Sequence, residues 1–285
     1  MEVITTIPAL RECLSGMRAK GKRVGFVPTM GFLHRGHVAL MEATKADPAV
    51  DLLVVSIFVN PLQFGPQEDY RDYPRDLERD KELCRAAGTD VLFVPAVEEM
   101  YPEGFATAVE VSGVTDVLCG RSRPGHFRGV ATVVAKLFNI VQPDVAYFGM
   151  KDAQQVVVIQ RMVADLNFPV AIKIHPTVRE ADGLAVSSRN TYLSPAERQA
   201  APVLYRSLQH AAEAIRAGER DAAKVRELLV REIGAERLAV LDYAEVVSWP
   251  ELKPVDELRA GNFLIAVAAR FGRARLIDNE LVEVK

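Results

Sequence analysis

Short runs of β-branched and aliphatic residues alternate with helical patterns over the first two thirds of the chain, and this alternation limits the possible folds more than any other feature. Segment 52–59 is apolar except for Ser56, a composition typical of strands that are buried on both faces. We expect strands at 23–27, 52–59, 91–94, 145–148 and 170–174, and helices at 36–46, 76–87, 130–141 and after Asp152. This rhythm predicts an α/β fold with a Rossmann-like parallel sheet covered by helices on both faces.

The pattern changes after about residue 189. Ser194-Pro195-Ala196-Glu197 combines an N-cap serine, a proline at the first helical position and a capping-box glutamate, so a long helix is expected to begin there. A second helix is expected at about 221–233, and strands at 239–247, 262–269 and 274–278. The chain is therefore predicted to form a Rossmann-like domain over residues 1–177 and a smaller C-terminal α+β domain over residues 178–285.

Composition narrows the class of function. A chain of 285 residues with 49% hydrophobic residues can bury a substantial core, and a net charge of -3 provides no basic field for nucleic acid. Cys13, Cys84 and Cys119 are odd in number and lack CxxC spacing, which disfavours a disulfide framework and a structural zinc site. Because we find neither a signal-peptide pattern nor a membrane-spanning run, we expect a cytoplasmic protein that acts on small molecules without membrane or nucleic-acid partners.

The most informative stretch, residues 28–37, follows the first expected strand and opens the first helix. A helix N-terminus attracts phosphate through its N–H groups and its dipole. His34 and His37 are three residues apart, so their imidazoles can point the same way and grip one phosphate, while Gly36 would let a nucleotide approach the backbone. Two alternatives stay open at this point: an ordinary strand-to-helix turn, and a His-x-x-His metal pair without an apparent third ligand.

Two further stretches also follow expected strands. At 56–65, the strand stops at Asn60, and Gln63 offers an amide that donates and accepts, which suits a hydroxy-acid substrate. At 147–155, Lys151 can pair with the outer phosphates of ATP, and Asp152 can cap the next helix or face a ribose or an ion. Gln155, one turn further into the helix, would face the same crevice as Gln63. Each stretch alone also fits an ordinary turn with exposed polar residues.

Two loops carry candidate anion-binding groups. In 176–190, two hydroxyls are followed by Arg189, a compact set for phosphate on a loop at the expected domain junction. In 118–130, a basic loop enters a helix, and Arg123 is a candidate for a substrate carboxylate. A solvated surface loop remains the alternative for both. Coincidence does not explain why the four stretches 28–37, 56–65, 147–155 and 176–190 fall at strand ends or at the domain junction.

Together the four stretches resemble the pantothenate synthetase family over most of the first 195 residues, with matching spacing between motifs. That family resembles class I aminoacyl-tRNA synthetases and small nucleotidyltransferases in its HxGH site and its Rossmann-like core. Two positions depart from the common pattern: Met150 and Cys119 stand where many members have Glu. We expect no loss of chemistry, because Lys151 and Arg123 beside them are present.

The resemblance implies a complete set of site residues. His37 would be a proton donor, with His34 beside it on the phosphates and Lys151 as the third catalytic group. Gln63 and Gln155 would hold pantoate, and Gln63 would also serve β-alanine. Further substrate contacts are implied for Asn60, Tyr73 and Arg123. The implied ATP contacts are Met30, Gly31, Phe32, Leu33, His34, Arg35, Gly36, His37, Gly149, Met150, Lys151, Asp152, Val178, Val186, Ser187, Ser188 and Arg189. No protein ligand is assigned to a metal.

The resemblance also implies a reaction. The pantoate carboxylate would attack the α-phosphate of Mg-ATP, releasing pyrophosphate and forming pantoyl adenylate, and the β-alanine amine would then displace AMP to give pantothenate, a precursor of coenzyme A. ATP is thus a co-substrate, Mg2+ its companion ion, and a homodimer the implied assembly.

Other functions remain alternatives. A nucleotidyltransferase would use the same HxGH site on a phosphorylated substrate, although paired glutamines suit such a substrate poorly. A non-catalytic nucleotide-binding module should tolerate the loss of His37. RNA ligation is disfavoured because no basic or anticodon-reading domain is evident.

Overall fold

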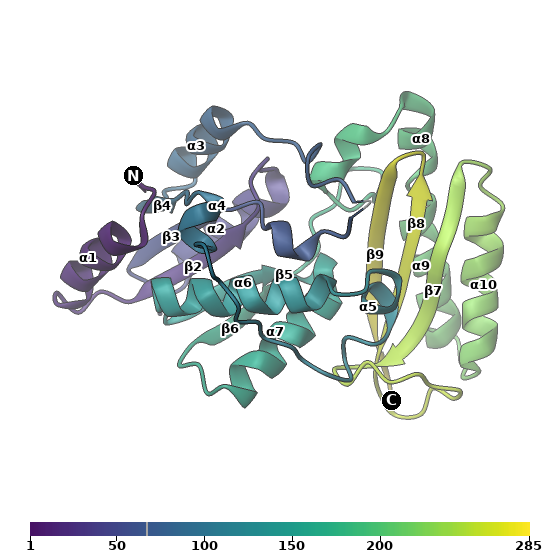
Figure 1. Ribbon diagram of the computed structural model, residues 1–285. Helices are drawn as coiled ribbons and strands as arrows, with labels where there is room; N and C mark the ends of the chain where they lie inside the picture. The colour runs from purple at the N-terminus through teal and green to yellow at the C-terminus, as the bar shows by residue number, and fades with distance from the viewer. Residues whose placement is uncertain (67) are drawn as a thin grey trace. The chain divides into compact units, whose positions relative to one another are not determined.

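The computed structural model describes residues 1–66 and 68–285. Figure 1 shows the ribbon with its helices and strands labelled. Up to residue 176 the elements are β1 (Glu2–Ile4), α1 (Ile7–Arg18), β2 (Val24–Thr29), α2 (Arg35–Ala46), β3 (Leu52–Ile57), the 3-10 turn η1 (Pro61–Gln63), α3 (Leu77–Ala86), β4 (Val91–Phe93), α4 (Val97–Met100), α5 (Leu118–Ser122), α6 (His126–Val141), β5 (Val145–Gly149), the 3-10 turn η2 (Met150–Asp152), α7 (Ala153–Asp165) and β6 (Ala171–His175). After residue 176 they are the 3-10 turn η3 (Ser188–Tyr192), α8 (Pro195–Ala200), α9 (Val203–Arg216), α10 (Ala222–Gly234), β7 (Ala239–Ser248), β8 (Gly261–Phe271) and β9 (Ala274–Val284).

Two compact units make up the described chain. Unit 1 consists of Met1–Ser112, Arg123–Met150 and Val158–Pro176, and unit 2 of Gly113–Ser122, Lys151–Val157 and Thr177–Lys285. Two short segments before residue 177 therefore group with unit 2. The division into domains at 1–177 and 178–285 remains a prediction, because a domain is a part that folds independently.

Unit 1 is built on a parallel six-stranded sheet in the order β1-β4-β3-β2-β5-β6. The chain moves from β2 outward to β4 on one side and then crosses to β5 on the other side of β2. The carboxyl ends of β2 and β5 therefore flank the switch point at which doubly wound sheets bind ligands. The α/β prediction is confirmed.

Strand β1 was not predicted. It is only three residues long, it lies at the edge of the sheet, and just Ile4 of the three is buried. Such a short segment lacks the alternation or the apolar run by which a strand is recognised in sequence.

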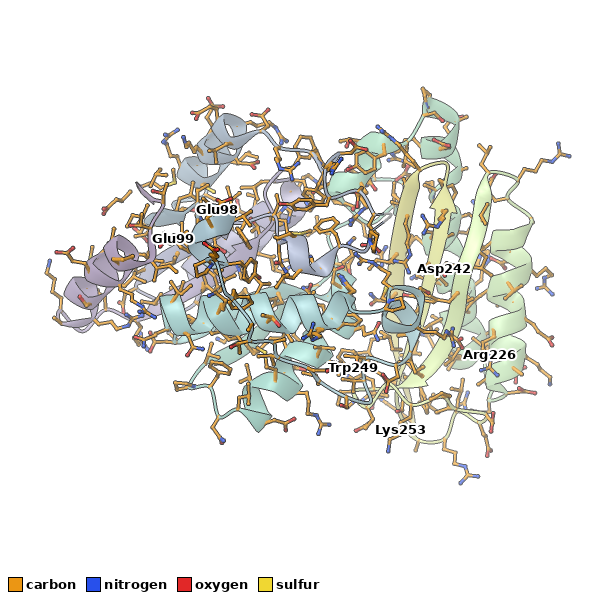
Figure 2. All side chains as sticks on the ribbon, viewed as in Figure 1. Glu98, Glu99, Arg226, Asp242, Trp249 and Lys253 are labelled. Carbon is orange, nitrogen blue, oxygen red and sulfur yellow. The ribbon has the colours of Figure 1, made fainter. Side chains whose placement is uncertain are left out.

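Helices cover both faces of this sheet. Val27 belongs to a core cluster with Leu33, Leu40 and Met41 at and before α2, whereas its neighbour Phe26 packs edge-on against Phe138 of α6. Because successive side chains of a strand point to opposite faces, α2 and α6 lie on opposite sides of the sheet. At the edge of unit 1, Glu99 on α4 accepts a hydrogen bond from the backbone nitrogen of Ile7, 2.7 Å away, at the start of α1 (Figure 2).

Unit 2 contains an antiparallel sheet in the order β7-β8-β9, packed against α9 and α10. The predicted C-terminal α+β part is confirmed. Strand β9 runs to Val284, beyond the predicted end at residue 278, because it pairs with β8 along its whole length.

The predicted long helix from residue 194 is wrong. The capping box of Ser194 and Glu197 is present, but α8 ends at Ala200 and α9 begins at Val203. Pro202 explains the interruption, since it has no N–H to continue the helical ladder and its ring clashes with the preceding turn. Among the described residues, no helix is both long and apolar enough to cross a bilayer.

Candidate active site

The two histidines of the HxGH motif form a stacked pair at the start of α2. Their ring centroids are 4.0 Å apart with an interplanar angle of 29°. His34 Nδ1 accepts from the backbone nitrogen of Gly36 at 3.1 Å, and His37 Nδ1 accepts from that of His34 at 3.3 Å. Since each Nδ1 is an acceptor, the hydrogen of each neutral ring is on Nε2. Each ring is therefore a donor through its Nε2–H, the chemistry that phosphate oxygens require.

Gly36 makes room for the His34 ring. A Cβ atom at this position would lie 3.0 Å from both Cε1 and Nδ1 of His34. The glycine was expected to admit a nucleotide to the backbone; in the structure, its contact is with the imidazole that caps the helix. Gly36 thus sets the ring position of the motif's first histidine.

The loop before the motif is fastened by two adjacent residues of α3. Asp80 is buried, and its carboxylate accepts from the backbone nitrogens of Phe32 and Leu33, each at 2.7 Å. Arg79 Nη1 donates to the Leu33 carbonyl at 3.0 Å, and its guanidinium lies 5.3 Å from the centre of the Phe32 ring. Phe32 has a φ of 48°, a region that costs energy for a non-glycine residue, so the loop depends on these contacts.

Burial raises the pKa of Asp80, while the backbone hydrogen bonds of Leu33 and Phe32 act in the opposite direction. Sequence reasoning missed this aspartate. It lies 47 residues from Leu33 in a helix with an unremarkable charged pattern, and no local signal marks it.

The turn at Gln63 follows β3 and lies at the same sheet edge as the end of β2, since Thr29 and Ile57 are register partners. Gln63 is buried, and its Nε2 lies 3.1 Å from Met30 Sδ. Asn60 Nδ2 donates to Gln63 Oε1 at 3.1 Å. The structure therefore brings together three of the predicted residues: Met30, Asn60 and Gln63.

Gly129 of α6 lets this turn pack closely against the helix. A Cβ atom there would overlap the carbonyl group of Leu62 and lie 2.6 Å from the backbone nitrogen of Gln63. Backbone atoms cannot move aside as a flexible side chain can, so glycine is required at this position.

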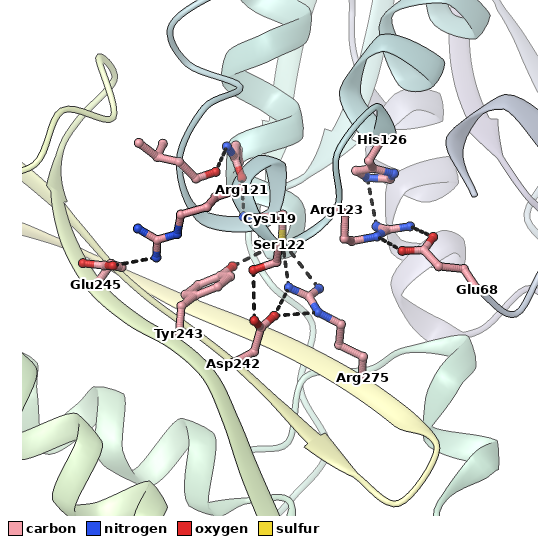
Figure 3. Close-up of polar contacts among 12 residues, drawn as sticks. Glu68, Cys119, Arg121, Ser122, Arg123, His126, Asp242, Tyr243, Glu245 and Arg275 are labelled. Atoms are coloured by element: carbon pink, nitrogen blue, oxygen red, sulfur yellow. Dashed lines mark hydrogen bonds and ion pairs between the residues drawn. The ribbon is translucent and has the colours of Figure 1, made fainter. Parts of the chain in front are cut away.

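Arg123 forms an ion pair with Glu68, and both residues belong to unit 1. Arg123 Nε and Nη2 donate to Oε1 and Oε2 of Glu68, each at 2.6 Å (Figure 3). Nη2 also donates to the Gln63 carbonyl at 3.3 Å. His126 lies between, with Nδ1 2.9 Å from the same carbonyl and Nε2 3.0 Å from Arg123 Nη1. Arg123 thus forms a bidentate pair with Glu68, a strong type of hydrogen-bonded ion pair. The same side chain holds the backbone of the Gln63 turn.

Despite burial, the ion pair with Arg123 lowers the pKa of the Glu68 carboxyl. Burial by itself would raise the pKa of its carboxyl, but the hydrogen bonds and charge of Arg123 outweigh burial and lower the pKa to about 2. Tyr73, predicted as a substrate contact, is buried with its ring edge-on to Phe64, 5.8 Å between centroids.

The segment after β5 is divided between the units. Gly149 ends β5 in unit 1, and a Cβ atom there would meet nothing within 4 Å. In unit 2, Lys151 and Asp152 form a 3.5 Å ion pair, and Asn279 Nδ2 donates to the Lys151 carbonyl at 2.9 Å. Gln155 is half-buried in α7. Asp152 ends the 3-10 turn η2 just before that helix.

The Ser-Ser-Arg loop belongs to unit 2 and contains hydrogen bonds between its own residues. Val186 donates from its backbone nitrogen to the Val178 carbonyl at 3.0 Å, and the Ser187 hydroxyl accepts from the backbone nitrogen of Arg189 at 3.3 Å as the cap of η3. Ser188 is buried. The loop therefore forms a capped 3-10 turn and not an extended segment.

Arg179 anchors the base of this loop. It pairs with the buried Asp278 through Nη1 at 2.6 Å and Nη2 at 3.0 Å, and its guanidinium stacks 4.0 Å from the Tyr205 ring centre. Among the described residues, no group of three or more His, Cys, Asp and Glu side chains is arranged to hold a metal ion.

Comparison with known proteins decides the family. A family model described as pantoate-beta-alanine ligase matches residues 2–281. The chain belongs to this family. Among curated members, the pantothenate synthetase of Pelotomaculum thermopropionicum is 57% identical over 282 residues, 99% of each chain. That of Heliobacterium modesticaldum is 58% identical over 281 residues, 98% of this chain and 99% of the relative.

Solved structures of pantoate–β-alanine ligases agree with the fold. Pantothenate synthetase from Thermus thermophilus is similar with a TM-score of 0.92 and 52% identity, over 98% of this chain and 99% of that one. The pantoate-beta-alanine ligase from Francisella tularensis, in a structure described as complexed with beta-gamma ATP and β-alanine, has a TM-score of 0.82 and 33% identity, over 99% and 97% of the chains. The resemblance found in the sequence motifs is confirmed.

Cys119 belongs to a polar cluster of unit 2 (Figure 3). Its sulfur lies 3.2 Å from the Tyr243 hydroxyl and 3.6 Å from Nη1 and Nη2 of Arg275. Arg275 is held in turn by Asp242 at 2.6 Å. Burial raises the pKa of Tyr243, so its hydroxyl keeps its proton.

Proposed function

We propose that this pantoate–β-alanine ligase works through an enzyme-bound pantoyl adenylate, with AMP and pyrophosphate as products. The observation that carries the proposal is the stacked His34–His37 pair at the start of α2, with both hydrogens on Nε2. Such donors stabilise charge that builds on an α-phosphate when a nucleophile attacks it. Membership of the ligase family and the Francisella relative's complex with an ATP form and β-alanine support the same assignment.

In the first step, an oxygen of the pantoate carboxylate bonds to the α-phosphorus and the bond to pyrophosphate breaks. His34 and His37 donate hydrogen bonds through Nε2–H to the phosphate oxygens, and the Nε2–H of His37 stabilises the negative charge on the departing pyrophosphate. The loop Met30–Leu33 and residues 35, 36 and 149–150 of unit 1 are proposed as further ATP contacts. In unit 2, we assign ATP binding to Lys151, Asp152, Val178, Val186, Ser187, Ser188 and Arg189.

In the second step, the amine of β-alanine attacks the carbonyl carbon of the mixed anhydride, and AMP leaves with the bridging oxygen. The residues need only exclude water and orient the amine, and proximity supplies much of the acceleration. We assign pantoate binding to Gln63 and Gln155, with Gln63 also serving β-alanine. The contacts of Asn60, Tyr73 and Arg123 favour a supporting role around the Gln63 turn over direct substrate contact.

Mg2+ is proposed to arrive with ATP, where it would neutralise charge on the phosphate oxygens. Asp152 fits as its protein ligand, because its side chain is 44% exposed and a single carboxylate beside substrate phosphates is a usual Mg2+ arrangement. A homodimer and a cytoplasmic location are proposed on the family resemblance.

Product analysis tests this function. Pyrophosphate and AMP should be measured from Mg-ATP with pantoate, with β-alanine, and with both. We expect pyrophosphate to require pantoate and stoichiometric AMP to require both substrates. Release of pyrophosphate with a phosphorylated acceptor, independent of pantoate, would favour the nucleotidyltransferase alternative and contradict the ligase.

A further inference from the structure

Asn60 has no hydrogen-bonding capacity left for a ligand. Its side chain is 1% exposed, and Nδ2 donates to Gln63 Oε1 and to the Gly129 carbonyl, both at 3.1 Å. Its Oδ1 accepts from the backbone nitrogen of Leu62 at 3.3 Å and from the Tyr101 hydroxyl at 2.8 Å. A primary amide has two donor hydrogens and two acceptor lone pairs, so these four contacts saturate it.

The orientation of both amides follows from these contacts. A backbone carbonyl only accepts and a backbone N–H only donates, so Gly129 and Leu62 fix which end of Asn60 is nitrogen. The group beside Asn60 Nδ2 must accept, which places Oε1 of Gln63 there and Nε2 on the other side. That Nε2 contacts Met30 Sδ, a weak acceptor that a substrate oxygen would replace favourably.

Tyr101 adds the outermost link. Its ring packs against Phe58 and Phe105, with centroids 5.9 Å and 4.9 Å away, so the hydroxyl is aimed at Asn60 by aromatic packing. Burial raises the pKa of Tyr101 far above its usual range, so the hydroxyl keeps its hydrogen and remains a donor. Tyr101 is absent from the predicted site and has no motif around it.

We propose that Tyr101 and Asn60 are positioning residues that fix the polarity of the Gln63 amide, so that the site recognises an acceptor oxygen of pantoate through a donated N–H. The acceptor is a carboxylate or hydroxyl oxygen. This inference rests on the proposed function, because it concerns how that same substrate is held.

Tyr101→Phe tests the outer link, since it keeps the ring and removes only the hydroxyl. We expect the KM for pantoate to rise by about two- to tenfold, the range set by the loss of one net hydrogen bond, with kcat and the KM for ATP unchanged. Tyr147→Phe is the matched control: it removes a hydroxyl that bonds Asp47 at the same 2.8 Å within unit 1. It should leave the KM for pantoate unchanged.

A double-mutant cycle tests whether Tyr101 acts through Gln63. In a Gln63→Ala background, Tyr101→Phe should produce no further change in kcat/KM for pantoate, measured by pyrophosphate release. An equal effect in both backgrounds, or an equal rise in the KM for ATP, would overturn the positioning role. Wild-type protein in the same assay separates the two proposals. Pyrophosphate release that does not depend on pantoate would contradict the proposed ligase reaction. If release depends on pantoate but Tyr101→Phe leaves the KM for pantoate unchanged, only the positioning role is contradicted.

Discussion

The carboxylate of Asp80 lies 2.7 Å from the backbone nitrogen of Leu33, one residue before the HxGH motif. This contact and its equivalent at Phe32 join helix α3 to the loop that sets the direction of α2. The strained φ of Phe32 is therefore held from outside the motif.

Asp80→Ala should slow adenylate formation by about tenfold or more, because the loop before the histidines loses its anchor and the two rings shift. A loss of about 1.4 kcal/mol of transition-state stabilisation is enough for a tenfold decrease in rate. The substitution should also cost about 1–3 kcal/mol of folding free energy, because the buried N–H of Leu33 and the partly buried N–H of Phe32 lose their acceptor. Stopped-flow pyrophosphate release and urea unfolding measure the two effects.

Asp76→Ala is the matched control for this variant. Asp76 caps the same helix by accepting a hydrogen bond from the backbone nitrogen of Arg79, whereas Asp80 accepts from the loop. Its removal should cost about 1 kcal/mol of stability and leave the rate of adenylate formation unchanged. Equal slowing in both variants would mean that α3 acts through stability alone.

Gly36→Ala should lower kcat/KM for ATP without destabilising the fold, because the new Cβ would lie 3.0 Å from the His34 ring and displace it. Gly16→Ala in α1 is the comparison, as nothing lies within 4 Å of its Cβ position. That change should stabilise the protein by up to about 1 kcal/mol through helix propensity and leave activity unchanged. Full activity in Gly36→Ala would remove the role assigned to its missing side chain.

Glu68→Gln should make stability less dependent on pH in the acid range. The pKa of Glu68 is lowered from 4.5 to about 2 in the folded state, so its contribution is fully present above pH 4.5 and is lost as the pH falls toward 2. For a side chain that is 26% exposed, this contribution is on the order of 2 kcal/mol. Urea unfolding from pH 6 to pH 3 should show a smaller loss in the variant, and parallel curves would contradict the ion pair's role.

The sequence predicts the central features of unit 1 because they are local. Segment 52–59 is apolar except for Ser56, and the HxGH spacing places both histidines within one helical turn. Each property can be recognised over a short stretch of chain. The long helix predicted from Ser194 is wrong, because Pro202 interrupts the helical hydrogen bonds between α8 and α9 although the capping box before it is present.

The supporting contacts could not be predicted, because they join residues that are remote in the chain. Asp80 and Leu33, Glu68 and Arg123, and Tyr101 and Asn60 are in contact only in the folded chain. In each pair the first partner is a common residue in an ordinary pattern, so nothing in its neighbourhood marks it. Gly129 was not recognised either, since a glycine in an apolar helix shows no sign of the turn that packs on it.

An isotope-transfer measurement tests the adenylate most directly. Pantoate labelled with 18O in its carboxylate should be converted with Mg-ATP and β-alanine, and the AMP, pyrophosphate and pantothenate analysed by mass spectrometry. Since the carboxylate oxygen that attacks the α-phosphorus leaves with AMP, we predict one 18O atom in each AMP and none in pyrophosphate. Unlabelled AMP, or label in pyrophosphate, would contradict attack at the α-phosphate and with it the role assigned to His34 and His37.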